Sequence, residues 1–256
     1  MIHFTELQTD FPALHKIAND NYLYPPVTNP DMIFPGQMLV VPSDLTTTNN
    51  SLFYVVTPGD VLYHIAIRFS TSLDLIAGVN PDIDDPNIIF PGQQLLVPAF
   101  VYNVEPGDTL YKIEQRFGIP RATIIRANLD RPRFSPDVIW PGYSLIIPLP
   151  TSANIAVVIP LPGTVIQNGQ QVAGWARAFE GNVLHQVRDA NGVVISRERS
   201  ATTNQGAPAY GWFQSSLPFD RPPTARTGEV WVYTRSARTG EIQDSVQIKV
   251  YFGSSQ

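Results

Sequence analysis

The sequence predicts a multidomain protein in which small α+β modules precede an all-β sandwich. Three observations predict this fold class. A motif recurs within the first 150 residues, each full copy passes from strand-like to helix-like and back to strand-like patterning, and the remaining residues alternate apolar and polar positions with period two. The 256-residue chain also has 24 prolines and 17 glycines, which fits short elements separated by many turns.

The repeat is visible in two motifs. Residues 54–60 read Tyr-Val-Val-Thr-Pro-Gly-Asp and residues 102–108 read Tyr-Asn-Val-Glu-Pro-Gly-Asp, an offset of 48. A second motif ends in an aromatic residue followed by Pro-Gly, and it occurs at 30–36, 86–92 and 136–142. Each copy of the second motif runs into an apolar stretch closed by proline. Matches of this length indicate tandem modules.

The first half of each full repeat is predicted to be a strand followed by a helix. Tyr54-Val55-Val56 is a short β-rich run before a Pro-Gly turn. Asp60 and Asp108 stand where a helix N-cap belongs, because a carboxylate there can accept unpaired amide hydrogens. One apolar helix face follows at i, i+3, i+4 and i+7, made of Leu62, Ile65, Ala66 and Phe69, and the next repeat has Leu110, Ile113 and Phe117.

The second half is predicted to be another short helix and a closing strand. Pro120 suits the first turn of that helix, where its missing N–H does no harm. Asn80 and Asn128 are predicted to end the helix, since asparagine tolerates the left-handed conformation. The closing strands are predicted at Leu95-Leu96-Val97 and Leu145-Ile146-Ile147.

These units resemble LysM modules. That family's pattern is an aromatic β start, Gly-Asp-Thr-Leu, an Ile-Ala helix, an Asn-Pro loop and then Ile-x-Pro-Gly-Gln-x-Leu-x-(Ile/Val)-Pro. Residues 53–98 and 101–149 match along their full length, with Ala99-Phe100 as a short linker between them. Residues 1–43 match only in their second half and are interpreted as a divergent or truncated module, followed by a longer linker at 43–52.

The last part of the chain is predicted to be an antiparallel β-sandwich, residues 154–253. Val246, Ile248 and Val250 point to one face of a strand, and the residues between them point to the other. Asn191-Gly192 lies between apolar runs and is a strong hairpin signal. No helical face interrupts these strands.

Three strings in this region resemble the immunoglobulin-like domain of bacterial spore germination and sporulation proteins. They are Val158 to Gly163, Val172 to Gly181, and Gly211-Trp212-Phe213, in that order. The resemblance implies an immunoglobulin-like sandwich that associates with another spore or envelope protein. It implies no catalytic residues.

The LysM resemblance implies binding of the N-acetylglucosamine backbone of peptidoglycan or of a chitin-like oligomer. Backbone amides and carbonyls of two loops would meet the acetamido group above an apolar floor. The implied glycan-binding residues are, in the first full module, Gly59, Asp60, Val61, Leu62, Asn80, Pro81, Asp82, Ile88 and Ile89, and in the second, Gly107, Asp108, Thr109, Leu110, Asn128, Leu129, Asp130, Val138 and Ile139. Val61 departs from the family's threonine, and Leu129 departs from its proline.

Each of these residues also has a purely structural interpretation, which the sequence leaves open. The glycines can simply permit a turn, the aspartates cap a helix, and Ile89 and Ile139 fill a core. Tyr63, Tyr111, Phe90 and Trp140 are able to stack on sugar rings. For Phe90 and Trp140, which precede Pro-Gly, packing is the favoured interpretation.

Composition argues against other functions. The chain has no cysteine, which removes thiolate metal sites and cysteine nucleophiles, and its net charge of −5 gives no support for nucleic-acid binding. The histidines at 3, 15, 64 and 185 lack metal-ligand spacing, and the cluster Asp82, Asp84 and Asp85 is expected to be a solvated turn. No cofactor, catalytic residue or metal site is predicted. No segment reaches the roughly 20 apolar residues of a membrane span, and no signal peptide is visible.

The predicted function is therefore non-catalytic binding of an N-acetylglucosamine-containing glycan, which anchors the sandwich at a bacterial cell wall or spore envelope. One alternative is a structural assembly protein of the spore or envelope that uses its modules for protein–protein contacts. A second alternative is a cell-wall hydrolase with an unrecognised site.

Overall fold

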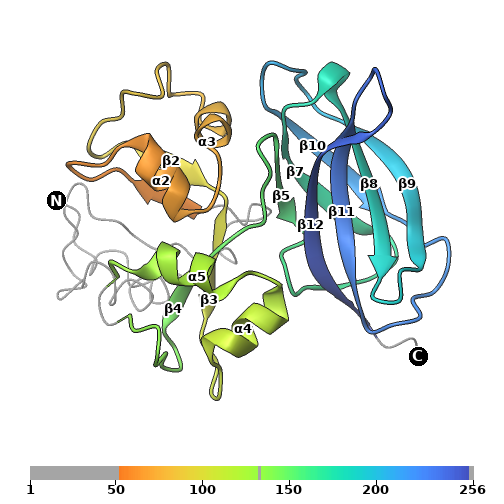
Figure 1. The fold of residues 1–256 in the computed structure, drawn as a ribbon, viewed down its shortest axis with the longest axis horizontal. Helices are drawn as coiled ribbons and strands as arrows, with labels where there is room; N and C mark the ends of the chain where they lie inside the picture. Colours follow the sequence, from red (N-terminus) through yellow and green to blue (C-terminus); the bar gives the residue numbers. More distant parts are fainter. Residues whose placement is uncertain (1–51, 132–133, 254–256) are drawn as a thin grey trace, which may run out of the picture.

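A computed structural model describes residues 52–131 and 134–253, and the two full repeats form βααβ modules as predicted (Figure 1). The predicted module at 53–98, with Leu52, is called module A, and the predicted module at 101–149, with Ala99 and Phe100, is called module B. The predicted divergent module at 1–43 lies outside the described residues. Module A is built from β1 (Leu52–Val55), α2 (Leu62–Arg68), α3 (Leu73–Val79) and β2 (Gln94–Val97), and module B from β3 (Ala99–Asn103), α4 (Leu110–Phe117), α5 (Arg121–Asn128) and β4 (Ser144–Pro148).

In each module the two strands pair antiparallel and the two helices cover them. Strand β1 pairs with β2 and strand β3 with β4. The predicted apolar face of α2 is confirmed, because Leu62, Ile65 and Phe69 are at most 2% exposed. Leu110, Ile113 and Phe117 are the buried residues of α4. A small core thus forms without disulfides, as a regular apolar helix stripe on a two-stranded sheet.

The predicted linker between the modules is absent. Ala99 and Phe100 belong to strand β3, and Pro98 alone separates it from β2. Ala99, Ala127 and Ile146 of module B pack into the core of module A. Since the two modules share buried side chains, they cannot tumble independently.

The C-terminal region is an all-β sandwich, as predicted. A three-stranded sheet has the order β10-β7-β5, and a five-stranded sheet has the order β6-β12-β11-β8-β9. The predicted Asn-Gly hairpin joins β8 to β9, and the predicted alternation in β12 places Val246, Ile248 and Val250 in the core. The strands are β5 (Ile155–Ile159), β6 (Val165–Ile166), β7 (Gln170–Ala176), β8 (Asn182–Asp189), β9 (Val194–Thr202), β10 (Gly211–Leu217), β11 (Thr227–Arg235) and β12 (Ile242–Phe252), with a short 3-10 helix, η3 (Phe179–Gly181), before β8.

The sandwich packs directly against both modules, with β5 on the side nearest to them (Figure 1). On module A, Leu75 and Val79 of α3 form one buried cluster with Ala156 and Tyr210 of the sandwich. On module B, the core extends to Val158 of β5. The three domains therefore form one continuous packed unit. None of the helices that the structure describes is long and apolar enough to cross a membrane.

Candidate glycan-binding surface

The turn after β1 is closed by the side chain of Asp60. One carboxylate oxygen accepts hydrogen bonds from the Tyr54 hydroxyl at 2.8 Å, from the Thr57 amide at 2.7 Å and from the Thr57 hydroxyl at 2.9 Å. Burial and the Asp60 carboxylate together raise the pKa of Tyr54 to about 12, so this hydroxyl remains a donor at neutral pH. Gly59 supplies the positive φ of 93° that the turn requires.

Module B repeats this arrangement. The Asp108 carboxylate accepts from the Tyr102 hydroxyl and from the Glu105 amide, and Gly107 again has a positive φ, 83°. Because one aspartate serves as the acceptor for a whole turn in both modules, the turn is rigid before any ligand arrives. The Pro-Gly-Asp motif therefore encodes a preformed loop.

The predicted N-cap role of Asp60 and Asp108 is wrong by one residue. The N-caps are Val61 and Thr109, and the Thr109 hydroxyl accepts from the Lys112 amide at 3.2 Å. Val61 has no side-chain oxygen, so α2 lacks this bond. The aspartate carboxylates accept hydrogen bonds within the preceding turn, so the residue after each aspartate occupies the N-cap position.

The second helices end at Asn80 and Asn128, as predicted, but the predicted left-handed conformation is wrong, because neither residue has a positive φ. Asn80 caps α3 with φ −118° and ψ 87°, and its side-chain amide bridges the Ile76 carbonyl at 2.8 Å and the Leu96 carbonyl at 2.9 Å. Its carbonyl oxygen accepts from the Leu96 amide at 2.6 Å. The Asn80 side chain thus links the end of α3 to the closing strand β2, and its two bonds to Leu96 resemble those between neighbouring strands.

Asn128 does the same in module B. Its amide donates to the carbonyls of Ile124 and Ile146, both at 2.7 Å, and it accepts from the Ile146 amide at 3.0 Å. Asn128 is the last residue of α5. At the other end of this helix, Pro120 is the N-cap, one residue before the first turn in which it was predicted. Since Asn80 and Asn128 are buried and fully hydrogen-bonded, their side chains position the loop that follows rather than face solvent.

The two predicted loops of each module lie side by side. In module A, the Gly92 amide donates to the Val56 carbonyl at 2.8 Å, and the Val56 amide donates to the Gln93 carbonyl at 2.9 Å. In module B, Gly142 and Val104 make the corresponding bond at 2.7 Å. The second Pro-Gly turn is therefore held next to the first.

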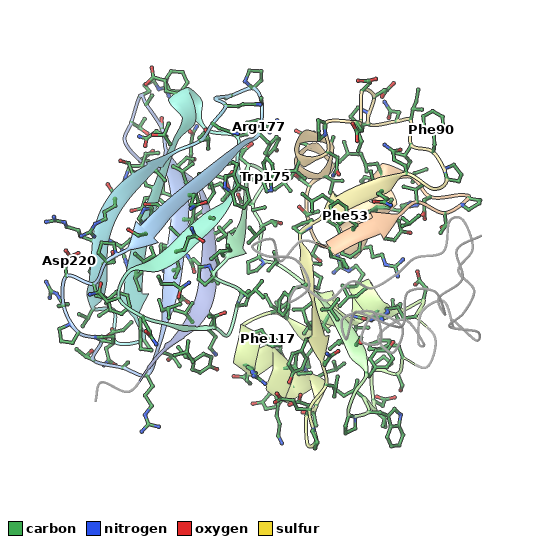
Figure 2. All side chains as sticks on the ribbon, turned by 180° about the vertical axis from the view of Figure 1, so that it is seen from behind. Phe53, Phe90, Phe117, Trp175, Arg177 and Asp220 are labelled. Carbon is green, nitrogen blue, oxygen red and sulfur yellow. The ribbon has the colours of Figure 1, made fainter. Side chains whose placement is uncertain are left out.

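Large apolar side chains are exposed on these loops and on the helix turns beside them. Phe90 and Trp140 are each 65% exposed, so the prediction that they are packing residues is wrong. Figure 2 shows Phe90 on the side of module A away from the sandwich. Ile88 and Val138 are a second matching pair on the loops, and Tyr63 and Tyr111 match in the first turns of α2 and α4. Val61 and Leu129 are also exposed, but their counterparts in the other module are Thr109 and Pro81.

The remaining predicted residues divide into two groups. Leu62 and Leu110 are core residues, and Ile89 and Ile139 are half-buried against the cores of their modules. These four shape the loops from beneath. The exposed or partly exposed remainder consists of Gly59, Asp60, Pro81, Asp82, Gly107, Asp108, Thr109 and Asp130.

Sequence reasoning missed the junction between the modules. Arg68 forms an ion pair with Asp130, Nη1 to Oδ2 2.9 Å, and Arg126 donates to the Ile67 carbonyl at 3.3 Å. A shallow pocket of about 280 Å³ lies here, lined by Asp60 and Leu129 among others. The sequence held one clue to this junction. Arg68 occupies the position of Arg116 in module B, and Arg116 forms its ion pair within its own module, with Glu105.

The two histidines that the structure describes, His64 and His185, do not belong to a metal-ligand cluster. Among the described residues, no group of three or more His, Asp or Glu side chains could hold a metal ion. His185 is buried in the sandwich with Nε2 3.0 Å from the Ser215 hydroxyl, and burial lowers its pKa to about 4. Asp82, Asp84 and Asp85 are exposed, as expected for a solvated turn.

Comparison with known protein families agrees with this architecture. The family model of the LysM domain matches residues 54–98 and 102–148. The model described as the immunoglobulin-like domain of bacterial spore germination matches residues 154–241. Both are binding-type domains, and they fit an association with a cell wall or spore.

Similar proteins come from bacteria and are longer than this chain. A putative sporulation-specific glycosylase, YdhD, of Bacillus subtilis (strain 168) is 41% identical over 95 residues, which are 37% of this chain and 21% of that protein. A chlorophenol reductase of Desulfitobacterium hafniense is 43% identical over 47 residues, 18% of this chain and 14% of that protein. The crystal structure of the Bacillus megaterium QM B1551 spore cortex-lytic enzyme SleL is 26% identical with a TM-score of 0.25, covering 48% of this chain and 25% of that one. The chain thus spans a quarter or less of each of these proteins.

Proposed function

Since this chain carries two LysM domains and an immunoglobulin-like domain of bacterial spore germination proteins, we propose that it binds an N-acetylglucosamine-containing glycan without catalysing a reaction on it. Peptidoglycan is the natural polymer of this kind in a bacterial wall or spore. The bound modules would anchor the sandwich there, where it would contact another spore or envelope protein.

One observation supports the proposal above the others: the same surface occurs twice. Each module sets an exposed aromatic residue, Phe90 or Trp140, beside a turn locked by aspartate. A large apolar side chain that is 65% exposed loses the stabilisation of burial, so its occurrence at the same place in both modules argues for use in binding.

The chemistry of the surface suits an acetamido sugar. A pyranose ring has an apolar face that packs on an aromatic side chain, and its acetamido group needs one donor and one acceptor. The exposed glycines at 59 and 107 leave backbone groups accessible, since nothing lies within 4 Å of a Cβ added at either. Rigid turns also reduce the ordering entropy lost on binding.

Two modules on one polymer would bind more tightly than either alone. The shared core of modules A and B fixes the spacing between their surfaces. When that spacing matches sites along the glycan, the second contact becomes intramolecular, which raises the overall affinity by about 10²–10⁴.

The glycosylase and lytic names of similar proteins raise the alternative of a wall hydrolase. The chain spans 21% of the glycosylase, and we propose that the shared part serves wall binding in both proteins. The carboxyl groups of Asp189, Glu198 and Asp220 have a lowered pKa, whereas the general acid of a glycoside hydrolase needs a raised one.

Retention on purified peptidoglycan and on chitin beads tests the proposal. We expect the full chain to be retained, Phe90→Ala and Trp140→Ala each to weaken retention, and the double variant to elute with the unbound fraction. Phe53→Ala is the matched control, because Phe53 is 52% exposed on strand β1 outside both loops.

Zymography on cell walls should show no clearing. Failure of the full chain to be retained on either polymer would overturn the proposal and favour the assembly role. Clearing that depends on a residue of this chain would favour the hydrolase.

A further inference from the structure

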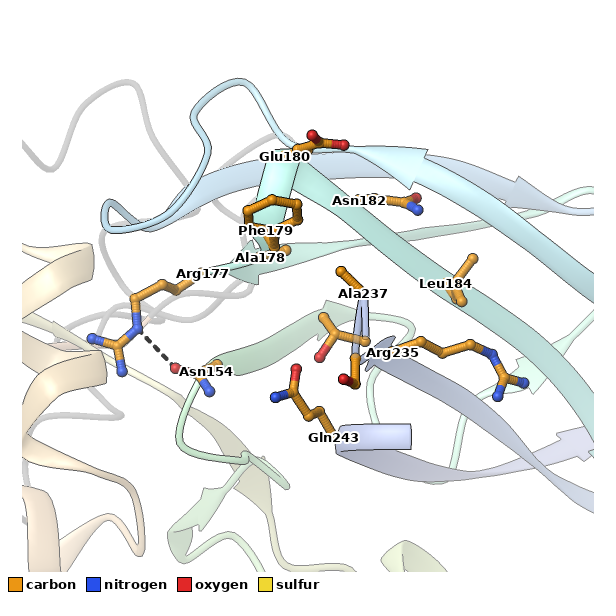
Figure 3. Close-up of a pocket in the computed structure, with 12 residues that line it drawn as sticks. Asn154, Arg177, Ala178, Phe179, Glu180, Asn182, Leu184, Arg235, Ala237 and Gln243 are labelled. Atoms are coloured by element: carbon orange, nitrogen blue, oxygen red, sulfur yellow. Dashed lines mark hydrogen bonds between the residues drawn. The ribbon is translucent and has the colours of Figure 1, made fainter. Parts of the chain in front are cut away.

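A pocket opens at one end of the sandwich, apart from the LysM surfaces (Figure 3). Its volume is about 410 Å³. The walls come from both sheets: the end of β7, helix η3, the start of β8, the end of β11 and the start of β12. Loops and strand ends fixed by a rigid scaffold are a common place for binding sites.

An aromatic residue is held outward at the rim. Phe179 in η3 is 66% exposed, although the backbone around it is fixed. Ala178 accepts amide hydrogens from Gly181 at 3.0 Å and from Ala207 at 2.9 Å, and Thr203 donates to the Gly181 carbonyl at 2.9 Å.

The backbone at the rim is also strained. Glu180 has a φ of 52°, one of two positive values among the described non-glycine residues. A non-glycine residue in this conformation is unfavourable and persists only where its surroundings impose it. The strain and the hydrogen bonds together present the Phe179 ring to solvent.

Three amide side chains are among the other residues that line the pocket. Asn154, Asn182 and Gln243 come from three different segments, and Figure 3 shows Gln243 extending toward Asn154. Within the ranges 52–131 and 134–253, the amides of Asn182 and Gln243 make no hydrogen bond to the protein. An amide both donates and accepts, which matches the paired requirements of sugar hydroxyl and acetamido groups.

The charges of the lining argue against an anionic ligand. Arg177 is paired with Asp74 of module A at 3.4 Å, and Arg235 is paired with Glu198 at 2.7 Å. Both guanidinium groups are therefore neutralised, while no ion pair of the described residues engages Glu180. A neutral ligand with an apolar face and several polar groups fits this environment.

We propose that this pocket of the sandwich is an additional binding site for a neutral N-acetylhexosamine oligomer, with Phe179 packing on a sugar ring and Asn182 and Gln243 bonding its polar groups. This inference rests on the proposed function, since it assigns the same class of polymer to a third site. Arg177 ties the pocket to helix α3 of module A, so the pocket and the modules are fixed relative to one another.

Amide NMR spectra of the full chain, titrated with tetra-N-acetylchitotetraose, test the inference. We expect saturable shifts of the Asn182 and Gln243 side-chain amides. Phe179→Ala should weaken binding at this pocket by about three- to tenfold, the size expected for loss of one aromatic contact. The same variant should leave the shifts of Gly59 and Gly107 in the modules unchanged, and Val165→Ala, an exposed apolar residue outside the pocket, should change neither set.

The outcomes separate the two proposals. Shifts confined to the modules would overturn the pocket inference and support the proposed function. Shifts confined to the pocket would support the inference and overturn glycan binding by the modules. Pocket shifts that persist unchanged in Phe179→Ala would overturn the role assigned to the aromatic ring and with it the site.

Discussion

The ring of Tyr210 in the sandwich lies against Gly78 in helix α3 of module A, so closely that a Cβ added at position 78 would overlap ring carbons. The ring cannot easily move away. Its hydroxyl donates to the Ala153 carbonyl at 2.7 Å, and Arg177 stacks 5.0 Å from its centre. Gly78 therefore serves the contact between module and sandwich, at the expense of helix propensity.

We expect Gly78→Ala to lower the free energy of unfolding by about 1–3 kcal/mol, the usual cost of overpacking. Alanine alone would favour the helix by roughly 1 kcal/mol, so a loss of stability would have to come from the contact. Urea titrations measure the effect. In a Tyr210→Ala background the same substitution should become neutral or stabilising, and an unchanged cost there would refute the explanation.

The first helices of the two modules differ in their caps, and the difference is testable by exchange. Val61→Thr should give α2 the hydrogen bond that Thr109 gives α4 and raise the free energy of unfolding by about 0.5–1 kcal/mol. Thr109→Val should lower it by a similar amount. Thermal unfolding of both variants checks the prediction, which fails if the two shifts have the same sign.

The buried asparagine of module B should be essential to its fold. Asn128→Ala would leave the Ile146 amide and two carbonyls without their partner in a buried place. We expect a loss of about 2–4 kcal/mol, because each unsatisfied buried group costs about 1–3 kcal/mol and water can reach some of them. Urea titration measures it, with Asn182→Ala as the control at an exposed asparagine. A loss no larger than in the control would show that Asn128 is dispensable.

Much of the fold could be predicted because the same sequence pattern occurs in both modules. The offset motifs defined both modules, and the apolar stripe of Leu62, Ile65 and Phe69 placed α2 correctly. Period-two alternation in the last strand predicted its buried face. These features depend on neighbours within a few residues, which a single sequence shows.

The errors have physical reasons of their own. Asp60 and Val61 are adjacent, and only the geometry decides that the carboxylate turns back to Thr57 while the next residue caps the helix. Phe90 precedes a Pro-Gly turn, and this local sequence is compatible with either a packed or an exposed ring. The exposure of Phe90 therefore could not be predicted from the sequence.

Contacts between domains were equally beyond the sequence. Gly78 and Tyr210 meet only because the sandwich folds back onto module A, and nothing in either local pattern points to the other.

The sandwich should lose stability on mild acidification through His185. Burial, and secondarily the charge of Arg199, lower the pKa of His185 from 6.5 to about 4. Well above pH 6.5 the imidazole is neutral in both the folded and the unfolded chain, so His185 does not reduce the free energy of unfolding there. As the pH falls toward 4 the unfolded chain takes up a proton that the folded chain does not, so the free energy of unfolding decreases.

We expect the free energy of unfolding to fall by about 2 kcal/mol between pH 7 and pH 5, measured by urea titration. His185→Leu should flatten this dependence even if it lowers stability at pH 7, because leucine cannot take up the proton. The same slope in the variant would show that another group causes the loss.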